Sequence, residues 1–291
     1  MKNLIYQFWD GKLTDACKAG VENLKIYAER IGAEHVFEHN PRFITNLGYY
    51  SPHYGAFKPA YTEKYHEYDN IMFADTDIFA LDGITDNVFE EFQKFSADIG
   101  ICTEPLQPIL RSRTDSNIAN AAYEKIWAAA IKNKWNVDLP KNKEGLLKVY
   151  NSGIVLYSNN GLKTVRDKFK SFLEYIDLVK KSKLSIFYQG DQNYLHAMLF
   201  VCGVDYIELD NEWNRYITYA GITKPKTKIC DPRTENTKFV HIQMRGADHY
   251  NAEQLWRITN LPVEQWGLDR VGNPFVRGDC LTGGDINKND L

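Results

Sequence analysis

Residues 68–81, with the sequence YDNIMFADTDIFAL, decide the fold of this 291-residue chain. The apolar run 71–74 (IMFA) ends abruptly in the triplet Asp75-Thr76-Asp77, and a second apolar run follows it. A short apolar segment that is closed by polar residues is typical of a buried parallel strand. The two aspartates would then lie beyond the carboxyl end of that strand, where open α/β sheets bind their ligands.

The spacing of Asp75 and Asp77 indicates what the pair could bind. Carboxylates one residue apart can share a hard divalent cation that also binds substrate phosphates. An isolated Asp-x-Asp is common, and a loop with two solvated acids is the alternative. The apolar flanks favour the metal site, because repulsion and desolvation make two ionised acids costly at the mouth of a buried strand unless a cation neutralises them.

The composition is that of an ordinary globular protein, and it argues against several classes of function. Hydrophobic residues make up 44% of the chain and charged residues 25%. The net charge of -3 argues against a nucleic-acid binder that works by bulk electrostatics. No run approaches the roughly 18 apolar residues of a membrane span. The five cysteines are scattered without metal-binding spacing, and the N-terminus is too polar for a signal peptide, so we expect reduced thiols and a cytoplasmic protein.

The pattern on both sides of residues 68–81 predicts alternating strands and helices. We expect strands at 3–8, 35–37, 98–102, 154–157, 204–209 and 238–242, and helices at 17–31, 54–68, 88–95, 118–134, 162–176 and 191–200. Right-handed crossovers turn such a series into a mostly parallel sheet flanked by helices. A single α/β domain is expected over residues 1–266, followed by a C-terminal tail at 267–291.

Three later segments could form one site together with the two aspartates. The segment 151–153 (NSG) forms a small polar turn before an apolar strand, the pair Asp191-Gln192 stands at a helix start, and His241 closes an apolar strand. Each has an ordinary structural explanation: a histidine is more often a core hydrogen-bonding residue than a ligand, and Asp191 fits a helix cap. Taken together with the aspartates, they are more specific than any one of them.

In chain order, these segments resemble the nucleotide-sugar-dependent glycosyltransferases of the GT-A fold, and most closely glycosyltransferase family 8. That group includes glycogenin and the bacterial lipopolysaccharide galactosyltransferases. The matching segments are 68–81, 150–158 (YNSGIVLYS), 190–196 (GDQNYLH), 208–216 (ELDNEWNRY) and 240–246 (VHIQMRG). Coverage runs from about Asn3 to Gly246, and the ordered set is much more specific than a single motif. The resemblance implies a Rossmann-like GT-A domain.

The resemblance also implies a site and a reaction. A Mn²⁺ or Mg²⁺ ion held by Asp75, Asp77 and His241 would bridge the diphosphate of a nucleotide-sugar donor, with a UDP-sugar favoured and with retention at the anomeric carbon. Asp191 and Gln192 would be catalytic, on the reacting face of the sugar. The implied donor-binding residues are Tyr6, Asp10, Lys58, Asp75, Thr76, Asn151, Ser152, Arg245 and Gly246. A solvated helix lysine is the alternative for Lys58.

The chain departs from the family pattern at two places. The usual glycine-x-x-lysine-proline-tryptophan after the histidine is absent, and Arg245 could supply the missing phosphate-binding charge. The first strand ends in 7–10 (QFWD) instead of a threonine- or asparagine-bearing turn, which leaves the choice between UDP and GDP open. The lysine-bearing segment 218–238 predicts a lid that orders over the donor, with a solvated loop as the alternative.

Two other functions remain open on the sequence. Haloacid-dehalogenase-like phosphatases also place Asp-x-Asp after an apolar strand, and Asp75 would then be a nucleophile. Those enzymes normally carry the motif on their first strand, with Thr or Val where this chain has Phe79. A non-catalytic nucleotide-sugar-binding module would keep the same fold. The acceptor, whether glycan, lipid or protein, is not readable from the sequence.

Overall fold

The structure, a computed structural model, describes residues 1–104, 117–216, 234–242 and 251–261, with the side chains of 117–121 and 216 left out. Several sequence predictions fall outside these residues. They concern Arg245 and Gly246, most of the lysine-bearing segment 218–238, and the tail 267–291.

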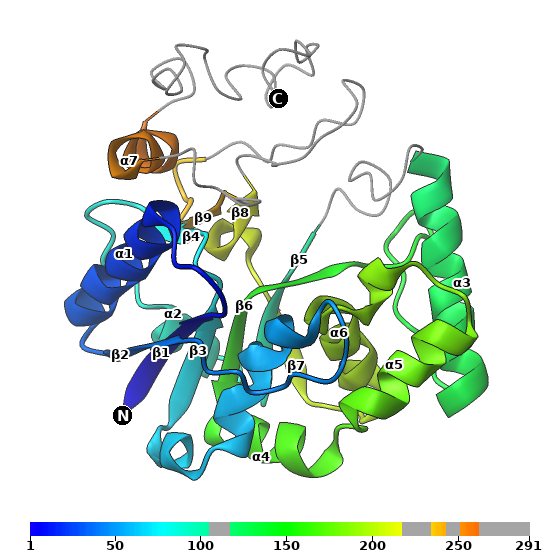
Figure 1. Cartoon of the computed structure of the whole chain (residues 1–291). Coiled ribbons are helices and arrows are strands. Elements are labelled where there is room, and N and C mark those ends of the chain that lie inside the picture. Colours follow the sequence, from blue (N-terminus) through cyan, green and yellow to red (C-terminus); the bar gives the residue numbers. More distant parts are fainter. Residues whose placement is uncertain (105–116, 217–233, 243–250, 262–291) are drawn as a thin grey trace.

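A six-stranded mixed sheet forms the centre of the protein (Figure 1), with the order β2-β1-β3-β6-β5-β7. Its strands are β1 (Asn3–Trp9), β2 (Glu34–His39), β3 (Asn70–Ala74), β5 (Ile99–Thr103), β6 (Tyr150–Ser158) and β7 (Tyr206–Leu209). Neighbouring strands run parallel except at β6, which is antiparallel to both β3 and β5. The predicted α/β fold with a mostly parallel sheet is thus confirmed, with one antiparallel strand inside it.

Helices cover both faces of this sheet, so its strands are buried on both sides. On one face, Ile5 and Met72 pack against α1 (Asp15–Ile31) and α2 (Val88–Gln93). On the other face, Leu4 and Ile71 belong to the core formed with two 3-10 helices (Ser51–Tyr61 and Glu63–Glu67), α3 (Asn117–Trp135), α4 (Asn159–Lys168), α5 (Phe172–Lys181) and α6 (Asp191–Val201). Successive residues of a strand point to opposite faces, and burial on both sides explains why these strands are continuous apolar runs.

A second, three-stranded sheet adjoins the end of β3. It has the order β4-β9-β8 and consists of β4 (Ile78–Ala80), β9 (Phe239–His241) and β8 (Arg215–Tyr216). The sequence pattern did not predict α7 (Ala252–Asn260), whose Leu255 and Ile258 pack with Phe79 and Val240. Strand β4 follows β3 directly and pairs with β9. The small sheet therefore places Phe239–His241 next to the carboxyl end of β3.

Three elements differ from the sequence-based expectations. The segment 151–153 belongs to strand β6 and is not a turn, since Asn151 pairs with Cys102 on β5. The expected long helix 162–176 is broken between α4 and α5, where the Ser171 side chain caps α5 by accepting from the Glu174 amide. The expected helix 54–68 is two 3-10 helices, Ser51–Tyr61, which contains Pro59, and Glu63–Glu67.

Two of the compositional expectations can be compared with the described residues. None of the helices there is long and apolar enough to cross a membrane. Cys17, Cys102 and Cys202 are free thiols.

Candidate metal and donor site

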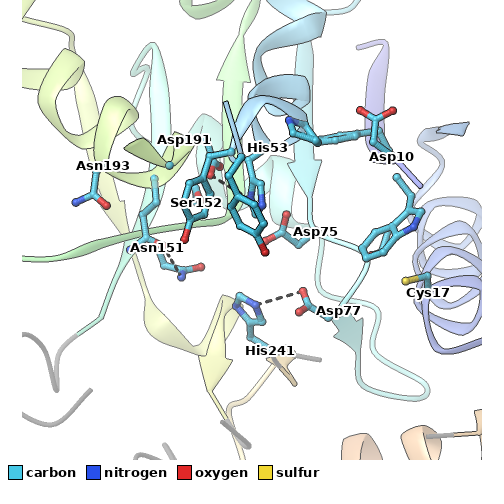
Figure 2. A pocket seen from close by; sticks show the side chains of 18 of the residues that line it. Asp10, Cys17, His53, Asp75, Asp77, Asn151, Ser152, Asp191, Asn193 and His241 are labelled. Atoms are coloured by element: carbon cyan, nitrogen blue, oxygen red, sulfur yellow. Dashed lines mark hydrogen bonds and ion pairs between the residues drawn. The ribbon is translucent and has the colours of Figure 1, made fainter. Parts of the chain in front are cut away.

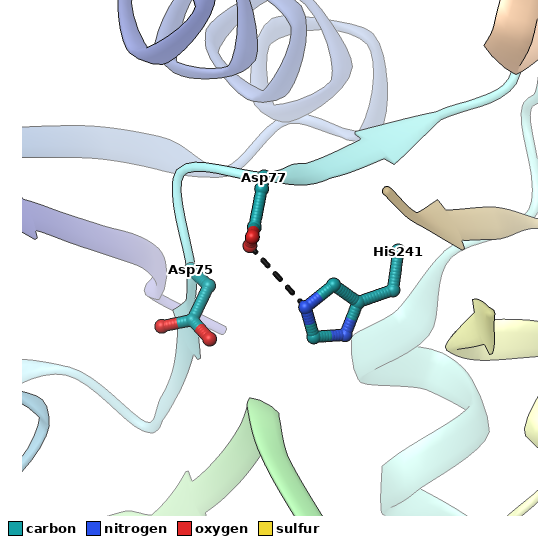
Figure 3. Close-up of side chains that lie close together, drawn as sticks. All are labelled: Asp75, Asp77 and His241. Atoms are coloured by element: carbon teal, nitrogen blue, oxygen red, sulfur yellow. Dashed lines mark ion pairs between the residues drawn. The ribbon is translucent and has the colours of Figure 1, made fainter. Parts of the chain in front are cut away.

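Asp75, Asp77 and His241 meet at the end of β3 (Figure 3). The loop that carries the two aspartates leads from β3 into β4, and β4 pairs with β9 in a register that sets Ile78 opposite His241. One ligand atom from each of the three side chains lies within 4.8 Å of the other two, and His241 Nε2 is 3.3 Å from Asp77 Oδ1. Two carboxylates and an imidazole fit a divalent cation such as Mn²⁺. The three predicted ligands therefore form a possible metal site.

A chain of hydrogen bonds fixes the ring of His241. The Glu104 Oε1 atom accepts from Asn151 Nδ2 at 2.8 Å, which leaves Asn151 Oδ1 to accept from Asn214 Nδ2 at 2.7 Å. Asn214 Oδ1 then lies 3.2 Å from His241 Nδ1, so this nitrogen carries the ring proton. The Nε2 atom, on the side of Asp77, is free of a proton in this tautomer and can bind a metal ion.

Sequence reasoning assigned no role to Asn214, Glu104 or Gly153 in holding the histidine. Asn214 and Glu104 are 2% and 5% exposed, although both are polar. A Cβ atom added at Gly153 would lie 2.7 Å from His241 Cε1, so only glycine lets the ring pack this closely on β6. Asn214 and Gly153 lie in the segments 208–216 and 150–158 that carried the family resemblance, and this was the available signal for them.

Replacing Asn214 by leucine should weaken Mn²⁺ binding about 10- to 100-fold, the usual cost of losing the hydrogen-bond partner of a metal ligand. Leucine has a similar volume but cannot accept from His241 Nδ1. The free Mn²⁺ signal in an electron-paramagnetic-resonance titration with UDP measures this affinity. Asn70→Leu, which removes a buried amide at the other end of β3, is the control and should bind Mn²⁺ normally. Wild-type affinity in Asn214→Leu would contradict the positioning role.

Helix α1 and strand β1 both contact the backbone of the loop that carries Asp75 and Asp77. A Cβ atom added at Gly20 would lie 1.9 Å from the carbonyl oxygen of Thr76, so helix α1 packs directly on the loop backbone. Gln7, which is fully buried on β1, donates from its side-chain amide to the Asp75 carbonyl at 3.1 Å. The other end of this amide, Oε1, is 3.0 Å from His35 Nε2. The backbone that carries the two carboxylates is therefore preorganised.

Changing Gly20 to alanine should lower the free energy of unfolding by about 2–4 kcal/mol, because the new methyl group collides with the backbone carbonyl group of Thr76. In an ordinary helix, the same change stabilises by up to about 1 kcal/mol. The sign of the effect therefore distinguishes close packing from simple helix propensity. Urea denaturation measures it, and a stabilised variant would contradict the contact between α1 and the loop.

A cavity of about 540 Å³ opens beside the three ligands (Figure 2). Asp10 and Cys17 lie on one side of it and Asp191 and Asn193 on the other, with Asp75 between them. Its volume falls within the range of about 300–1,000 Å³ that is usual for small-ligand sites. The sequence-predicted residues that line it are Asp10, Asp75, Thr76, Asp77, Asn151, Ser152, Asp191, Gln192 and His241.

Two predicted donor-binding residues, Tyr6 and Lys58, do not line this cavity. The Tyr6 hydroxyl donates to Glu38 Oε2 at 3.1 Å, and Lys58 forms an ion pair with the same carboxylate. Tyr65 donates to the other oxygen of Glu38 at 2.8 Å. The positive charge of Lys58 is therefore matched within the protein, and the structure places Tyr6 and Lys58 around Glu38, outside the lining of the cavity.

The cavity has an acidic lining in which burial raises the pKa of two carboxylates, those of Asp75 and Asp191. Burial, followed by the negative charges of Asp77 and Asp191, raises the pKa of Asp75 well above its usual range. Burial also raises the pKa of Asp191, against the opposing effects of His53 and of a hydrogen bond with Ser152. Carboxylates in such surroundings are costly to ionise unless a cation lies among them.

The metal-free protein should lose stability, relative to an Asp75→Asn variant, as the pH rises from about 4. The unfolded chain loses the Asp75 proton near pH 3.9, whereas the folded protein keeps it to a higher pH. Unfolding therefore releases a proton in this window, and the free energy of unfolding falls by up to about 1.4 kcal/mol per pH unit. Chemical denaturation in EDTA between pH 4 and 7 measures the difference. Parallel pH profiles for the two proteins would contradict the raised pKa.

Comparisons with known proteins match the chain to solved structures only: no protein-family model and no curated protein matches it. Mouse xyloside xylosyltransferase 1 in its apo form matches with a TM-score of 0.47 and 14% identity, over 83% of this chain and 97% of that one. The galactosyltransferase LgtC in complex with donor and acceptor sugar analogs matches with a TM-score of 0.46 and 13% identity, over 88% and 94%.

A glycosyltransferase involved in the glycosylation of the major capsid of PBCV-1 matches with a TM-score of 0.45 and 12% identity, over 83% of this chain and 93% of that one. All three matched proteins are glycosyltransferases, the class that the sequence motifs resemble. At TM-scores of 0.45–0.47 and identities of 12–14%, these matches carry no activity, donor or acceptor over to this chain.

Proposed function

We propose that this protein is a metal-dependent glycosyltransferase that moves a sugar from a nucleotide-diphosphate sugar to an acceptor. One observation carries the proposal: Asp75, Asp77 and His241 bring ligand atoms within 4.8 Å of one another beside a cavity of about 540 Å³. Such a cavity suits a small ligand, and oxygen and imidazole ligands suit a cation that also binds phosphates.

Asp75, Asp77 and His241 would hold Mn²⁺ or Mg²⁺. When bound, this cation acts as a Lewis acid that neutralises the charge developing on the departing nucleotide. Asp10 lies on the β1 side of the cavity, away from Asp191, and would contact the nucleoside. UDP and retention at the anomeric carbon are favoured by the motif resemblance.

Asp191 and Gln192 would bind the sugar at the start of α6. Gln192 Oε1 accepts from Asn151 Nδ2 at 3.2 Å, which orients the amide in the cavity wall. The Asp191 carboxylate also lies in this wall, where it could stabilise the positive charge that develops at the anomeric carbon. Asn151 and Ser152, on β6, lie between these residues and the metal ligands and would contact the donor between its diphosphate and its sugar.

The proposal is tested by incubating the purified protein with Mn²⁺ and a panel of UDP- and GDP-sugars and measuring nucleotide release. Slow donor hydrolysis that needs Mn²⁺ and stops in EDTA is the expected result. Release of inorganic phosphate from a phosphomonoester would instead indicate the phosphatase alternative, with Asp75 as nucleophile. Nucleotide-sugar binding without turnover would indicate a binding module.

A further inference from the structure

Gln7, on β1, connects the loop of the candidate metal site to the edge strand β2. It is fully buried, although the residues before it on β1 form an apolar run, 4–6 (LIY). Its Nε2 atom donates to the Asp75 carbonyl at 3.1 Å, and its Oε1 atom lies 3.0 Å from Nε2 of His35. His35 lies on β2 and does not line the cavity, so it reaches the site through Gln7.

The direction of these two hydrogen bonds follows from the acceptor in the loop. A backbone carbonyl cannot donate, so the Asp75 oxygen requires the NH2 end of the Gln7 amide. The Oε1 end therefore faces His35, whose Nε2 atom must carry a proton and donate to it. Burial, followed by the positive charge of Lys25 and against the opposing charge of Glu22, lowers the pKa of His35 to about 4. At neutral pH the ring thus carries one proton, at Nε2.

A leucine would be the simpler residue at position 7 of this sheet. A buried amide stabilises a protein little even when both of its ends are bonded, and it lowers stability when one end loses its partner. The bond from Gln7 is also not needed to satisfy the Asp75 carbonyl, which accepts from the Ile78 amide at 3.3 Å as well. The amide is therefore explained better by its place behind the two candidate metal ligands than by the stability of the fold.

We propose that Gln7 and His35 are positioning residues that hold the Asp75 and Asp77 carboxylates in the arrangement that binds the metal ion. This inference rests on the metal site of the proposed function. The Asp75 carbonyl belongs to the peptide that joins Asp75 to Thr76, so its rotation would turn Asp77 relative to Asp75. Gln7 restrains that rotation, and His35 keeps the Gln7 amide in the orientation that does so. Hydrogen-bond partners behind a metal site commonly set its affinity in this way.

Mn²⁺ affinity, measured on the full chain by electron-paramagnetic-resonance titration with UDP, tests the His35–Gln7 pair. His35→Phe removes the donor, Gln7→Leu removes the amide, and the double variant removes both. We expect all three to bind Mn²⁺ about tenfold more weakly than wild type. The double variant should be no weaker than Gln7→Leu alone, because His35 acts through Gln7. His35→Gln places an amide nitrogen near the position of Nε2, can still donate, and should keep the wild-type affinity.

Melting temperatures separate this role from a purely structural one. His35→Phe leaves the Gln7 Oε1 atom buried without its donor and should melt below wild type. The double variant has no unpaired amide and should melt at or above the wild-type temperature, yet still bind Mn²⁺ weakly. Asn70→Leu is the control, since it removes the side-chain hydrogen bond between Asn70 and Asn3 at the other end of the same two strands. This variant should keep the wild-type Mn²⁺ affinity.

Wild-type Mn²⁺ affinity in a stable double variant would overturn the positioning role, as would a double variant that binds the ion much more weakly than Gln7→Leu. Hydrogen exchange in EDTA tests the same role without the metal. The Ile78 amide, which donates to the Asp75 carbonyl, should exchange at least about fivefold faster in Gln7→Leu than in wild type or Asn70→Leu. Unchanged exchange would overturn the role. A wild-type protein that binds no Mn²⁺, with faster exchange in Gln7→Leu, would overturn the proposed metal-dependent function and leave Gln7 and His35 as residues that position the loop.

Discussion

Asp75→Asn is expected to abolish Mn²⁺-dependent binding of UDP and, at neutral pH, to make the metal-free protein more stable. Both effects have one cause. The carboxylate is a candidate metal ligand, and without the metal its burial, followed by the negative charges of Asp77 and Asp191, raises its pKa. The neutral amide has nearly the same shape but removes the repulsion. We expect Mn²⁺ affinity to fall more than about 100-fold and the free energy of unfolding in EDTA to rise by about 1–3 kcal/mol.

Calorimetric titration of Mn²⁺ with UDP and chemical denaturation in EDTA measure these two effects on one preparation. Asp77→Asn should share the loss of Mn²⁺ affinity. Asp82→Asn, an exposed carboxylate just after β4, is the matched control and should behave as wild type in both measurements. Undiminished Mn²⁺ affinity in both Asp75→Asn and Asp77→Asn would remove the aspartates from the metal site.

His241→Ala should lose both metal affinity and stability, because the ring serves the metal site and the core at once. It is 3% exposed, packs on Gly153 and faces Asn214 Oδ1, which would be left without this partner. A cavity and an unsatisfied amide together should cost about 2–4 kcal/mol of unfolding free energy. The rise in melting temperature on adding Mn²⁺ and UDP should nearly vanish. Any preference for Mn²⁺ over Mg²⁺ should weaken too, since imidazole suits Mn²⁺ better.

Melting curves with and without each metal separate the two roles of His241. His66→Ala is the control, since the His66 ring lies 2.9 Å from the Ala60 carbonyl through Nε2 and does not line the cavity. This variant should lose stability and keep its full response to Mn²⁺. If His241→Ala behaved in the same way, with a normal response to Mn²⁺, the histidine would be a core residue and not a ligand.

The alternation of apolar runs and amphipathic helices was enough to predict the strands, their burial on both faces and the edge of the sheet that carries the site. The direction of β6 was not predictable in this way, because a strand buried on both faces has the same composition whether it runs parallel or antiparallel. The break between α4 and α5 was missed for a related reason. The apolar spacing continues through Phe169 and Phe172, whereas the break depends on a single cap at Ser171.

The candidate metal ligands were predictable because each lies at the end or the start of an apolar strand, a local feature of the sequence. Their support was not, because Asn214, Glu104 and Gly20 reach the site through contacts between distant segments. The same limit explains Lys58. Its partner Glu38 lies on β2, and nothing in the sequence pairs the two.

Anomalous diffraction from crystals grown with Mn²⁺ and UDP tests the central claim most directly. The account predicts a manganese peak among Asp75, Asp77 and His241, within about 2.0–2.6 Å of a ligand atom of each, with the diphosphate on its open side. Bound UDP in the cavity without a manganese peak at these three residues, or manganese ordered only elsewhere, would contradict it.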